Sequence, residues 1–422
     1  MSGRRLLIAV TLALAVIGAA ADAQAQGLGQ TMGNALSNNC GSFGGTNVFA
    51  LVGSSFVLVG KSSLGSSQLN ALCAPSGGAS TGNAQVSTGS VSVEERQTGT
   101  DTERRILQRL QERRDGRATS GASADMTGAL RGLSFFVTGE YQSFDKETTS
   151  LELGYGRETW GTTFGADYAV GGLGILGLAF TYNQAKGFYD VGGGGFDIDT
   201  YGATLYGSLF PVKSLFVDGY VGYNRKDYDS DRRHTVTIPI LGGGSVVSAG
   251  SALGSTHADE FKAGLNLGYD FVVRNFTVGP RVGLNYRDTS IAGFTEHSAG
   301  TPTGLELDFL RQNQTSLTTV LGVFSSLAIS TGFGVVVPQV TAEYVHEFED
   351  DQKSHGFRFV QDAGATIFRF RTDPPDRDYF NVGAGVSLVL ANGLVPFVNY
   401  RELLGYQRQT NHAVTAGLRF SF

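Results

Sequence analysis

From Leu133 to the C-terminus, apolar and polar residues alternate with a period of two. In the segment 260–271, one face carries Phe, Ala, Leu, Leu, Tyr and Phe, and the other carries Glu, Lys, Gly, Asn, Gly and Asp. The next segment, 276–287, divides its residues in the same way. A period of two with one apolar face is typical of a β-strand. The pattern therefore predicts an all-β domain.

Further segments show the same alternation less perfectly, and together they predict about 12 strands of roughly ten residues each, an even number as in bacterial outer-membrane barrels. The predicted strands are 133–142, 159–169, 174–184, 199–210, 215–225, 260–271, 276–287, 315–329, 335–348, 379–390, 394–404 and 412–422. We therefore predict a transmembrane antiparallel β-barrel.

The two faces of the predicted strands differ in a way that orients the barrel wall. One face carries bulky aromatic residues, and the other carries glycine and charged residues. A barrel of this size has a wide interior, which suits water or a polar plug, so the apolar face is predicted to contact lipid. Tyrosines near the strand ends are expected to form girdles at the membrane interfaces: Tyr141, Tyr168, Tyr182, Tyr223, Tyr269, Tyr286, Tyr344 and Tyr400.

The links between the predicted strands alternate in length. Short links at 170–174, 211–214, 272–275, 330–334 and 391–393 alternate with longer ones, which include 187–197, 227–256, 288–314 and 349–377. Outer-membrane barrels have short periplasmic turns and long outer loops. Both ends of the barrel are therefore expected on the periplasmic side, and a soluble β-sandwich does not explain the alternation.

A charged segment at 92–117 precedes the barrel. Thr100 and Glu103 have the spacing of a capping box, and Gly116 can end a helix. The predicted helix, 101–115, would be about 22 Å long, close to the apolar height of an outer-membrane barrel. Its apolar stripe is narrow, consisting only of Ile106, Leu107 and Leu110. Two interpretations stay open: a solvated or coiled-coil helix, and a helix inside a polar tunnel.

Charged residues on the inward face bear on that choice. They are Asp218, Glu260, Lys262, Arg281, Arg287, Glu343, Arg401 and Arg419. In a confined pore these mixed charges can pair with each other, or with the helix residues Arg104, Arg105, Arg109 and Glu112. Simple solvation of the lumen explains them equally well.

The N-terminus has the pattern of a secretory signal peptide. Arg4 and Arg5 precede an apolar run from Leu6 to Ala21, and small residues follow at the spacing of a cleavage site. We expect cleavage after Ala25. A membrane-spanning helix would need about 20 apolar residues.

Composition agrees with an exported β protein. Of 422 residues, 60 are glycine, and the formal net charge of −6 excludes the basic footprint of a nucleic-acid-binding protein. The mean hydropathy of −0.04 excludes a helical membrane bundle. The only cysteines, Cys40 and Cys73, lie in a Gly/Ser-rich segment, and in an oxidising compartment they are expected to form one disulfide.

The C-terminal residues carry a family resemblance. The sequence from Thr415 through Gly417 and Phe420 to Phe422 resembles the signal read by the barrel-assembly machinery. Together with the exported N-terminus, the charged helix and the predicted barrel, the chain resembles the translocator domain of autotransporters, the type V secretion family of Gram-negative bacteria. Segments 161–183 and 337–348 are also similar to this family.

The resemblance implies an outer-membrane barrel that holds a helix in its pore and helps an upstream passenger to reach the cell surface. It divides the chain into a signal peptide (1–25), a short passenger (26–91), a linker helix (92–130) and the barrel (131–422). Family passengers are usually long solenoids, so residues 26–91 form an unusually short one, which is exposed on the surface or retained in the periplasm or pore. The implied partners are outer-membrane lipid, the barrel-assembly machinery and periplasmic chaperones, with no cofactor and no nucleic acid.

Two other functions are open. One is a diffusion channel formed by the same barrel. The other is an outer-membrane hydrolase, with His234 beside Asp231 or His355 near Asp350 and Asp351 in predicted outer loops. The G-x-S-x-G match at 78–82 lacks the strand–turn–helix setting of a nucleophile elbow. The G-x-G-x-x-G match at 172–177 is predicted to be a hairpin turn, and no residue cluster has metal-ligand spacing.

Overall fold

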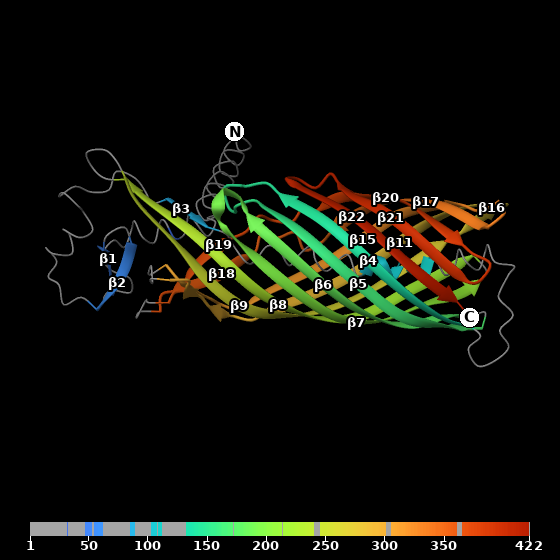
Figure 1. Ribbon diagram of the computed structural model, residues 1–422, viewed down its shortest axis with the longest axis horizontal. Coiled ribbons are helices and arrows are strands. Elements are labelled where there is room, and N and C mark those ends of the chain that lie inside the picture. The colour runs from blue at the N-terminus through green and yellow to red at the C-terminus, as the bar shows by residue number, and fades with distance from the viewer. Residues whose placement is uncertain are drawn as a thin grey trace, which may run out of the picture.

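The computed structural model describes residues 32, 47–52, 55–61, 85–88, 103–107, 109–111, 132–171, 173–212, 214–239, 245–300, 305–360 and 365–421 (Figure 1). Several predictions fall outside these residues. They are the signal peptide, the Cys40–Cys73 disulfide, the G-x-S-x-G match, the ends of the helix with Glu112, and Phe422.

Twelve antiparallel strands close into a barrel, which confirms the predicted fold. In order around the barrel they are β4 (Leu133–Lys146), β5 (Tyr155–Val170), β6 (Gly174–Tyr189), β7 (Gly194–Val212), β8 (Leu215–Pro239), β9 (Ser245–Tyr269), β11 (Phe276–Ile291), β15 (Gln312–Leu327), β17 (Gly334–Glu347), β20 (Asp378–Val389), β21 (Leu394–Leu404) and β22 (Gln409–Ser421). The barrel closes because β22 pairs with β4, from Ser421↔Ser134 to Gln409↔Lys146.

The outward face of the strands is apolar, as predicted. In β6 buried and exposed residues alternate along nearly the whole strand, and Leu176, Leu178 and Phe180 are on the exposed face. Of the predicted girdle tyrosines, Tyr168, Tyr182, Tyr223, Tyr269, Tyr286 and Tyr400 are each more than a third exposed. Such an apolar belt suits lipid. Among the described residues, no helix is both long and apolar enough to cross a bilayer.

The orientation of this belt can be tested on β6. Leu178 lies near the middle of the apolar part of the outward face, which ends at Tyr182, and a charge there should sit near the bilayer midplane. We expect Leu178→Arg to lower the free energy of unfolding in lipid by about 2 to 4 kcal/mol. Gln184→Arg, on the same face beyond Tyr182, should change it by at most about 1 kcal/mol. Equal effects of the two substitutions in urea unfolding would contradict this orientation.

The short turns confirm the predicted pattern, but the limits of two outer loops were wrong. The predicted loop 227–256 is mostly strand, because β8 and β9 stay paired up to Pro239↔Ser245. Likewise, the predicted loop 187–197 is reduced to the one-turn helix η1 (Asp190–Gly192) and its flanks, between β6 and β7. Residues 227–235 are largely polar on both faces, because this part of the hairpin extends beyond the apolar belt. The hydropathy alternation is lost there, although the backbone pairing continues.

Two further outer loops, 292–311 and 348–377, join to form a small separate sheet. Its strands are β12 (Phe294–Thr295), β14 (Leu307–Phe309), β18 (Ser354–Phe359) and β19 (Phe368–Arg371). Phe309 is its centre, since its ring lies 5.0 Å from that of Phe294 and 6.4 Å from those of Phe357 and Phe370. Short strands extend the ends of the larger sheet: β10 (Phe271–Val273), β13 (His297–Ser298) and β16 (Ile329–Thr331).

Part of the high glycine content serves the inner wall of the barrel. A Cβ at Gly187 would lie 2.1 Å from the ring of Phe196, and one at Gly268 would lie 2.2 Å from the ring of Phe216. Both rings are buried on neighbouring strands. The inward glycines therefore make room for aromatic rings that lie flat along the wall.

Segments preceding the barrel lie at its outer end. β1 (Asn47–Val52) and β2 (Ser55–Lys61) form an antiparallel hairpin, and β3 (Gln85–Thr88) pairs with the outer part of β8 (Figure 1). In Figure 1 these strands lie at the end of the barrel opposite to the C-terminus.

Candidate functional site

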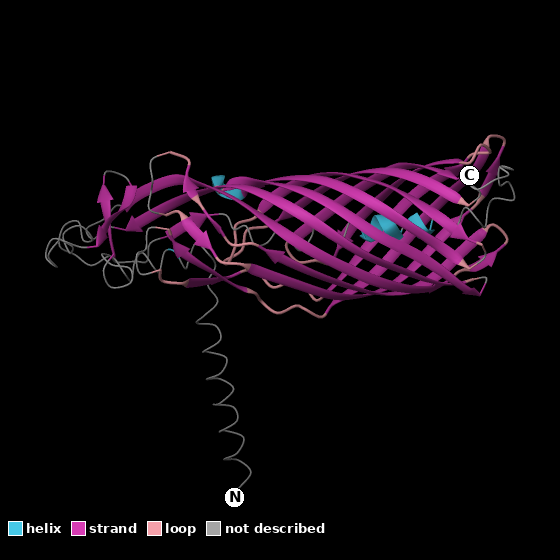
Figure 2. Cartoon of the chain, turned by 90° about the horizontal axis from the view of Figure 1, so that it is seen from below, coloured by secondary structure: helices cyan, strands magenta, loops and turns pink. Residues whose placement is uncertain are grey.

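A short inner helix, residues 103–107 and 109–111, lies inside the barrel (Figure 2). Its apolar residues Ile106 and Leu110 are fully buried, and Leu107 packs beside them. They contact an apolar patch on the inner wall that includes Phe136, Ile175, Ala179, Tyr206 and Tyr220. The interpretation as a helix in a tunnel is therefore correct for the described residues, and the narrow stripe suffices because the patch that it meets is equally small.

Arg109 binds the wall most closely. Its Nε donates to Asp167 Oδ2 at 2.8 Å, and its Nη2 donates to Ser134 Oγ at 2.9 Å and forms an ion pair with Asp167. Tyr206 Oη donates to the same carboxylate at 3.1 Å, and the guanidinium lies 4.9 Å from the Phe136 ring centre. The side chains of Arg109 and Asp167 are almost fully buried. Removing either charge would break a buried ion pair.

Arg105 makes a second set of contacts one turn nearer the outer end. Its two Nη atoms each donate at 3.0 Å, one to Thr163 Oγ1 and one to Asn183 Oδ1. Its Nε lies 3.6 Å from the carboxylate of Glu140, which also accepts a hydrogen bond from Thr415 at 2.9 Å. The helix is thus held by both arginines against β4, β5 and β6.

The opposite side of the helix makes weaker contacts. Arg104 lies 3.6 Å from Glu343, and both side chains are partly exposed. Arg281 donates to Gln111 and lies 4.6 Å from the ring centre of Phe324. On this side the lumen contains a cavity of about 130 Å³, whose lining includes Gln339, Glu343 and Arg401. This volume has room for a few ordered water molecules.

A layer of buried charges surrounds Glu103 at the start of the helix. Lys226 donates to Glu260 at 2.8 Å, and both side chains are fully buried. Glu103 interacts electrostatically with Lys262 and Arg287 across the lumen. The negative and positive charges of this layer come from the helix and the wall together.

The predicted lumen charges can now be located. Asp218, Glu260, Lys262, Arg287 and Arg419 are buried, and Arg281, Glu343 and Arg401 line the lumen cavities. Asp218 accepts a hydrogen bond from Ser208 at 2.6 Å. Glu140 and Asp167 were not among the predicted lumen charges, although each has inward parity in a predicted strand, and neither was Lys226, just past the end of one.

The C-terminal residues complete the barrel wall. Thr415 faces the lumen, whereas Phe420 is on the outward face and more than a third exposed. Gly417 also faces inward, where a Cβ would lie 2.6 Å from the ring of Phe397. Of Thr415, Gly417 and Phe420, only Phe420 therefore faces the outside of the barrel.

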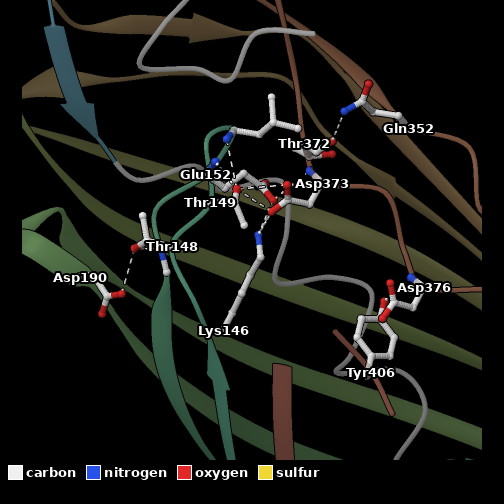
Figure 3. A network of polar contacts seen from close by, with 12 residues as sticks. Lys146, Thr148, Thr149, Glu152, Asp190, Gln352, Thr372, Asp373, Asp376 and Tyr406 are labelled. Atoms are coloured by element: carbon white, nitrogen blue, oxygen red, sulfur yellow. Dashed lines mark hydrogen bonds and ion pairs between the residues drawn. The ribbon is translucent and has the colours of Figure 1, made fainter. Parts of the chain in front are cut away.

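At the outer end, a buried ionic cluster ties two loops together across strands β21 and β22 (Figure 3). Lys146 at the end of β4 forms ion pairs with Glu152 and Asp373, the latter at 2.8 Å. Thr149 Oγ1 donates to Asp373 Oδ2 at 2.9 Å, and the Asp373 amide donates to Glu152 at 3.0 Å. The loop 348–377 is thereby fastened to the loop between β4 and β5.

This cluster should respond to pH. Burial raises the pKa of Glu152 to about 7, against the opposing effect of Lys146. Burial alone would raise the pKa of Asp373 as well, but the hydrogen bond from Lys146 holds it below its usual value. The contribution of Glu152 is complete below its usual pKa of 4.5 and is lost as the pH rises through 7, whereas that of Asp373 is lost only in stronger acid.

We therefore expect the loop 348–377 to open more readily at pH 8 than at pH 5, by at most about 3 kcal/mol. Hydrogen exchange of its amides, corrected for intrinsic rates, measures this difference. Glu152→Gln should abolish the pH dependence, while Glu158→Gln, at an exposed carboxylate in β5, should preserve it. A pH dependence that survives in Glu152→Gln would contradict the assignment.

The candidate catalytic histidines do not form pairs with their predicted acids. His234 is buried on the inward face of β8, whereas Asp231 lies on the other face and accepts hydrogen bonds from Ser251 and Arg233. His355 is buried in β18 against the ring of Phe370, and Asp350 binds Arg377 instead. The predicted β5–β6 hairpin is confirmed, although residues 174–177 of the G-x-G-x-x-G match belong to strand β6 and not to the turn. In the part of the chain that the structure describes, no group of residues could hold a metal ion.

The comparisons with known proteins agree with this architecture. The sequence model of the autotransporter beta-domain matches residues 135–401, more than half of the chain. The translocator domain of autotransporter NalP from Neisseria meningitidis is similar in fold, with a TM-score of 0.56, 15% identity and coverage of 76% of this chain and 96% of that one. The beta domain of the Bordetella autotransporter BrkA has a TM-score of 0.46 and 15% identity, with coverage of 69% and 100%. No curated protein sequence matches significantly.

Proposed function

Because the chain belongs to the autotransporter beta-domain family, whose barrels lie in the outer membrane, we propose that it exports and anchors its own N-terminal segment. In this proposal residues 26–91 are a short passenger on the cell surface, and the inner helix stays in the lumen as a plug. The barrel carries no catalytic function. Residues 1–25 are a cleaved signal peptide, and the barrel-assembly machinery and periplasmic chaperones insert the barrel into the lipid.

One observation carries the proposal. The inner helix is bound to the wall of the lumen by buried ionic contacts, at a level between the outer and the periplasmic end of the barrel. Arg105 and Arg109 bind the wall, and Arg104 lines a cavity of about 70 Å³ together with Asp376 of the outer loop 348–377. The N-terminal side of the described helix therefore faces toward the outer loops. This is the arrangement expected when the segment before the helix has passed outward and the helix has followed it into the pore.

The absence of catalysis is supported by geometry. His234 lies on the opposite face of β8 from Asp231, which accepts hydrogen bonds from Ser251 and Arg233, and Asp350 pairs with Arg377. Substitution of His234 or His355 by glutamine is therefore expected to remove no hydrolytic activity.

A diffusion channel is the second candidate. Cavities of about 130, 70 and 50 Å³ lie beside the helix, and a continuous path through the lumen would have to include such spaces. A resident channel would show stable conductance with the full chain in a planar bilayer. A plugged translocator should stay closed, with brief small openings.

The role of the barrel in export can be tested by truncation. A chain that ends at residue 130 and carries an epitope tag after Gly27 should accumulate in the periplasm. The full chain with the same tag should fractionate with the outer membrane. Recovery of the truncated chain on the cell surface would show that export does not need the barrel.

A further inference from the structure

The outer extension of β8 has one open edge. β7 pairs with β8 only as far as Gly194↔Arg232, whereas β9 pairs with it up to Pro239. The edge beyond Arg232 would present unpaired backbone groups on the side where β7 has ended. Such an edge is a template for pairing with another strand.

Residues 85–88 occupy this edge. β3 pairs antiparallel with β8 from Gln85↔Thr237 to Thr88↔His234. Within the described part of the chain, it is the strand that replaces β7 there. Both partners favour β-structure, since Val and Thr are frequent in Gln85–Thr88 and in the facing sequence 235–237.

The direction of β3 fits a chain that enters the lumen from outside. β8 runs away from the short turns toward the outer end, so the antiparallel β3 runs back toward the barrel. The inner helix follows at residue 103. The intervening residues, 89–102, can reach up to about 50 Å when extended.

We propose that the outer extension of the β8–β9 hairpin is a docking edge for the exported N-terminal segment, which adds residues 85–88 to it as a strand. This inference rests on the proposed export function. Docking fixes the segment beside the outer opening and covers a strand edge that would otherwise pair with other chains.

Cross-linking tests the register directly. In a Cys40→Ser, Cys73→Ser background, we would introduce two cysteine pairs, Val86→Cys with Val236→Cys and Ser87→Cys with Thr235→Cys. Neighbouring antiparallel pairs alternate between Cα separations of about 4.5 and 5.5 Å, within the range of a disulfide. The control is Ser87→Cys with Thr237→Cys, a diagonal pair about 7 to 8 Å apart.

The reaction is run on intact cells with an epitope tag after Gly27 and a protease site inserted at residue 120. After cleavage, fragments that remain joined without reductant report the cross-link. The proposal predicts an accessible tag and a cross-link in at least one in-register pair that exceeds the control severalfold. An accessible tag with no in-register excess overturns docking and leaves export standing. A protected tag overturns the proposed export, and docking with it.

Proline substitutions give an independent test. Along an edge strand, alternate N–H groups point to the partner, so only one of Val86→Pro and Ser87→Pro removes a bond to β8. We expect one of these variants, and not the other, to increase cleavage of residues 62–84 by external protease. Equal cleavage of both would contradict the added strand.

Discussion

Deletion of residues 92–117 is expected to open the barrel, with a severalfold rise in single-channel conductance and in uptake of antibiotics that the intact membrane excludes. The inner helix packs against the wall at the level of Phe136 and Tyr206, and cavities of about 130 and 50 Å³ lie beside it. Without the helix, the wall exposes inward charges such as Asp167 and Glu140 to water. Polar side chains around a wide pore favour hydration and conduction.

A matched deletion separates the plug from chain length. Removal of residues 62–84, which leaves the helix and the barrel intact, should keep conductance at the level of the full chain. Heat-modifiable migration on gels confirms that both variants contain a folded barrel. If the 92–117 deletion conducts no better than this control, the helix is not the barrier.

Arg109→Met is expected to loosen the inner helix strongly. It removes the guanidinium that pairs with Asp167, whose side chain is fully buried. Breaking a buried ion pair costs about 3 to 5 kcal/mol. We expect the binding of the helix in the lumen to be weakened by this free energy. The fraction of time that single channels are open should then rise at least about a hundredfold.

The reference for this effect is Arg104→Met. Its pair with Glu343 is longer, at 3.6 Å, and partly exposed, so its loss should cost at most about 1 kcal/mol. Adding Asp167→Asn to Arg109→Met should recover most of the stability, because the buried charge that Arg109 balances is removed as well. Equal effects of Arg104→Met and Arg109→Met would contradict a specific anchoring role for Arg109.

The fold was predictable because each strand has one face toward lipid and one toward the lumen. Apolar and polar residues therefore alternate along its sequence. All twelve strands were located, since the apolar face of segments such as 260–271 and 276–287 meets lipid along most of its length. The prediction of strand limits failed where the two faces of a strand no longer differ in polarity. In residues 227–235 both faces are largely polar, so the outer half of the β8–β9 hairpin had the composition of a loop.

The contacts inside the lumen were only partly accessible from the sequence. Inward parity located charges such as Glu260 and Arg281 on the wall, and composition located Arg105 and Arg109 on a helix. The pairing of Arg109 with Asp167 depends on how deep the helix lies in the barrel and on its rotation about its axis. The pattern of residues in the sequence predicts neither. The loop cluster of Lys146 and Asp373 joins residues more than two hundred positions apart, and it follows from the closed order of the strands.

The proposed function requires that the barrel exports the segment that precedes its helix. It is tested most directly by an epitope tag placed after Gly27 in the full chain and probed on intact cells with antibody and external protease. If the barrel exports this segment, the antibody binds and protease removes the tag while the outer membrane is intact. A tag that is detected only after the outer membrane is broken would contradict export, and the protein would then be a plugged barrel that keeps its N-terminal segment inside the cell envelope.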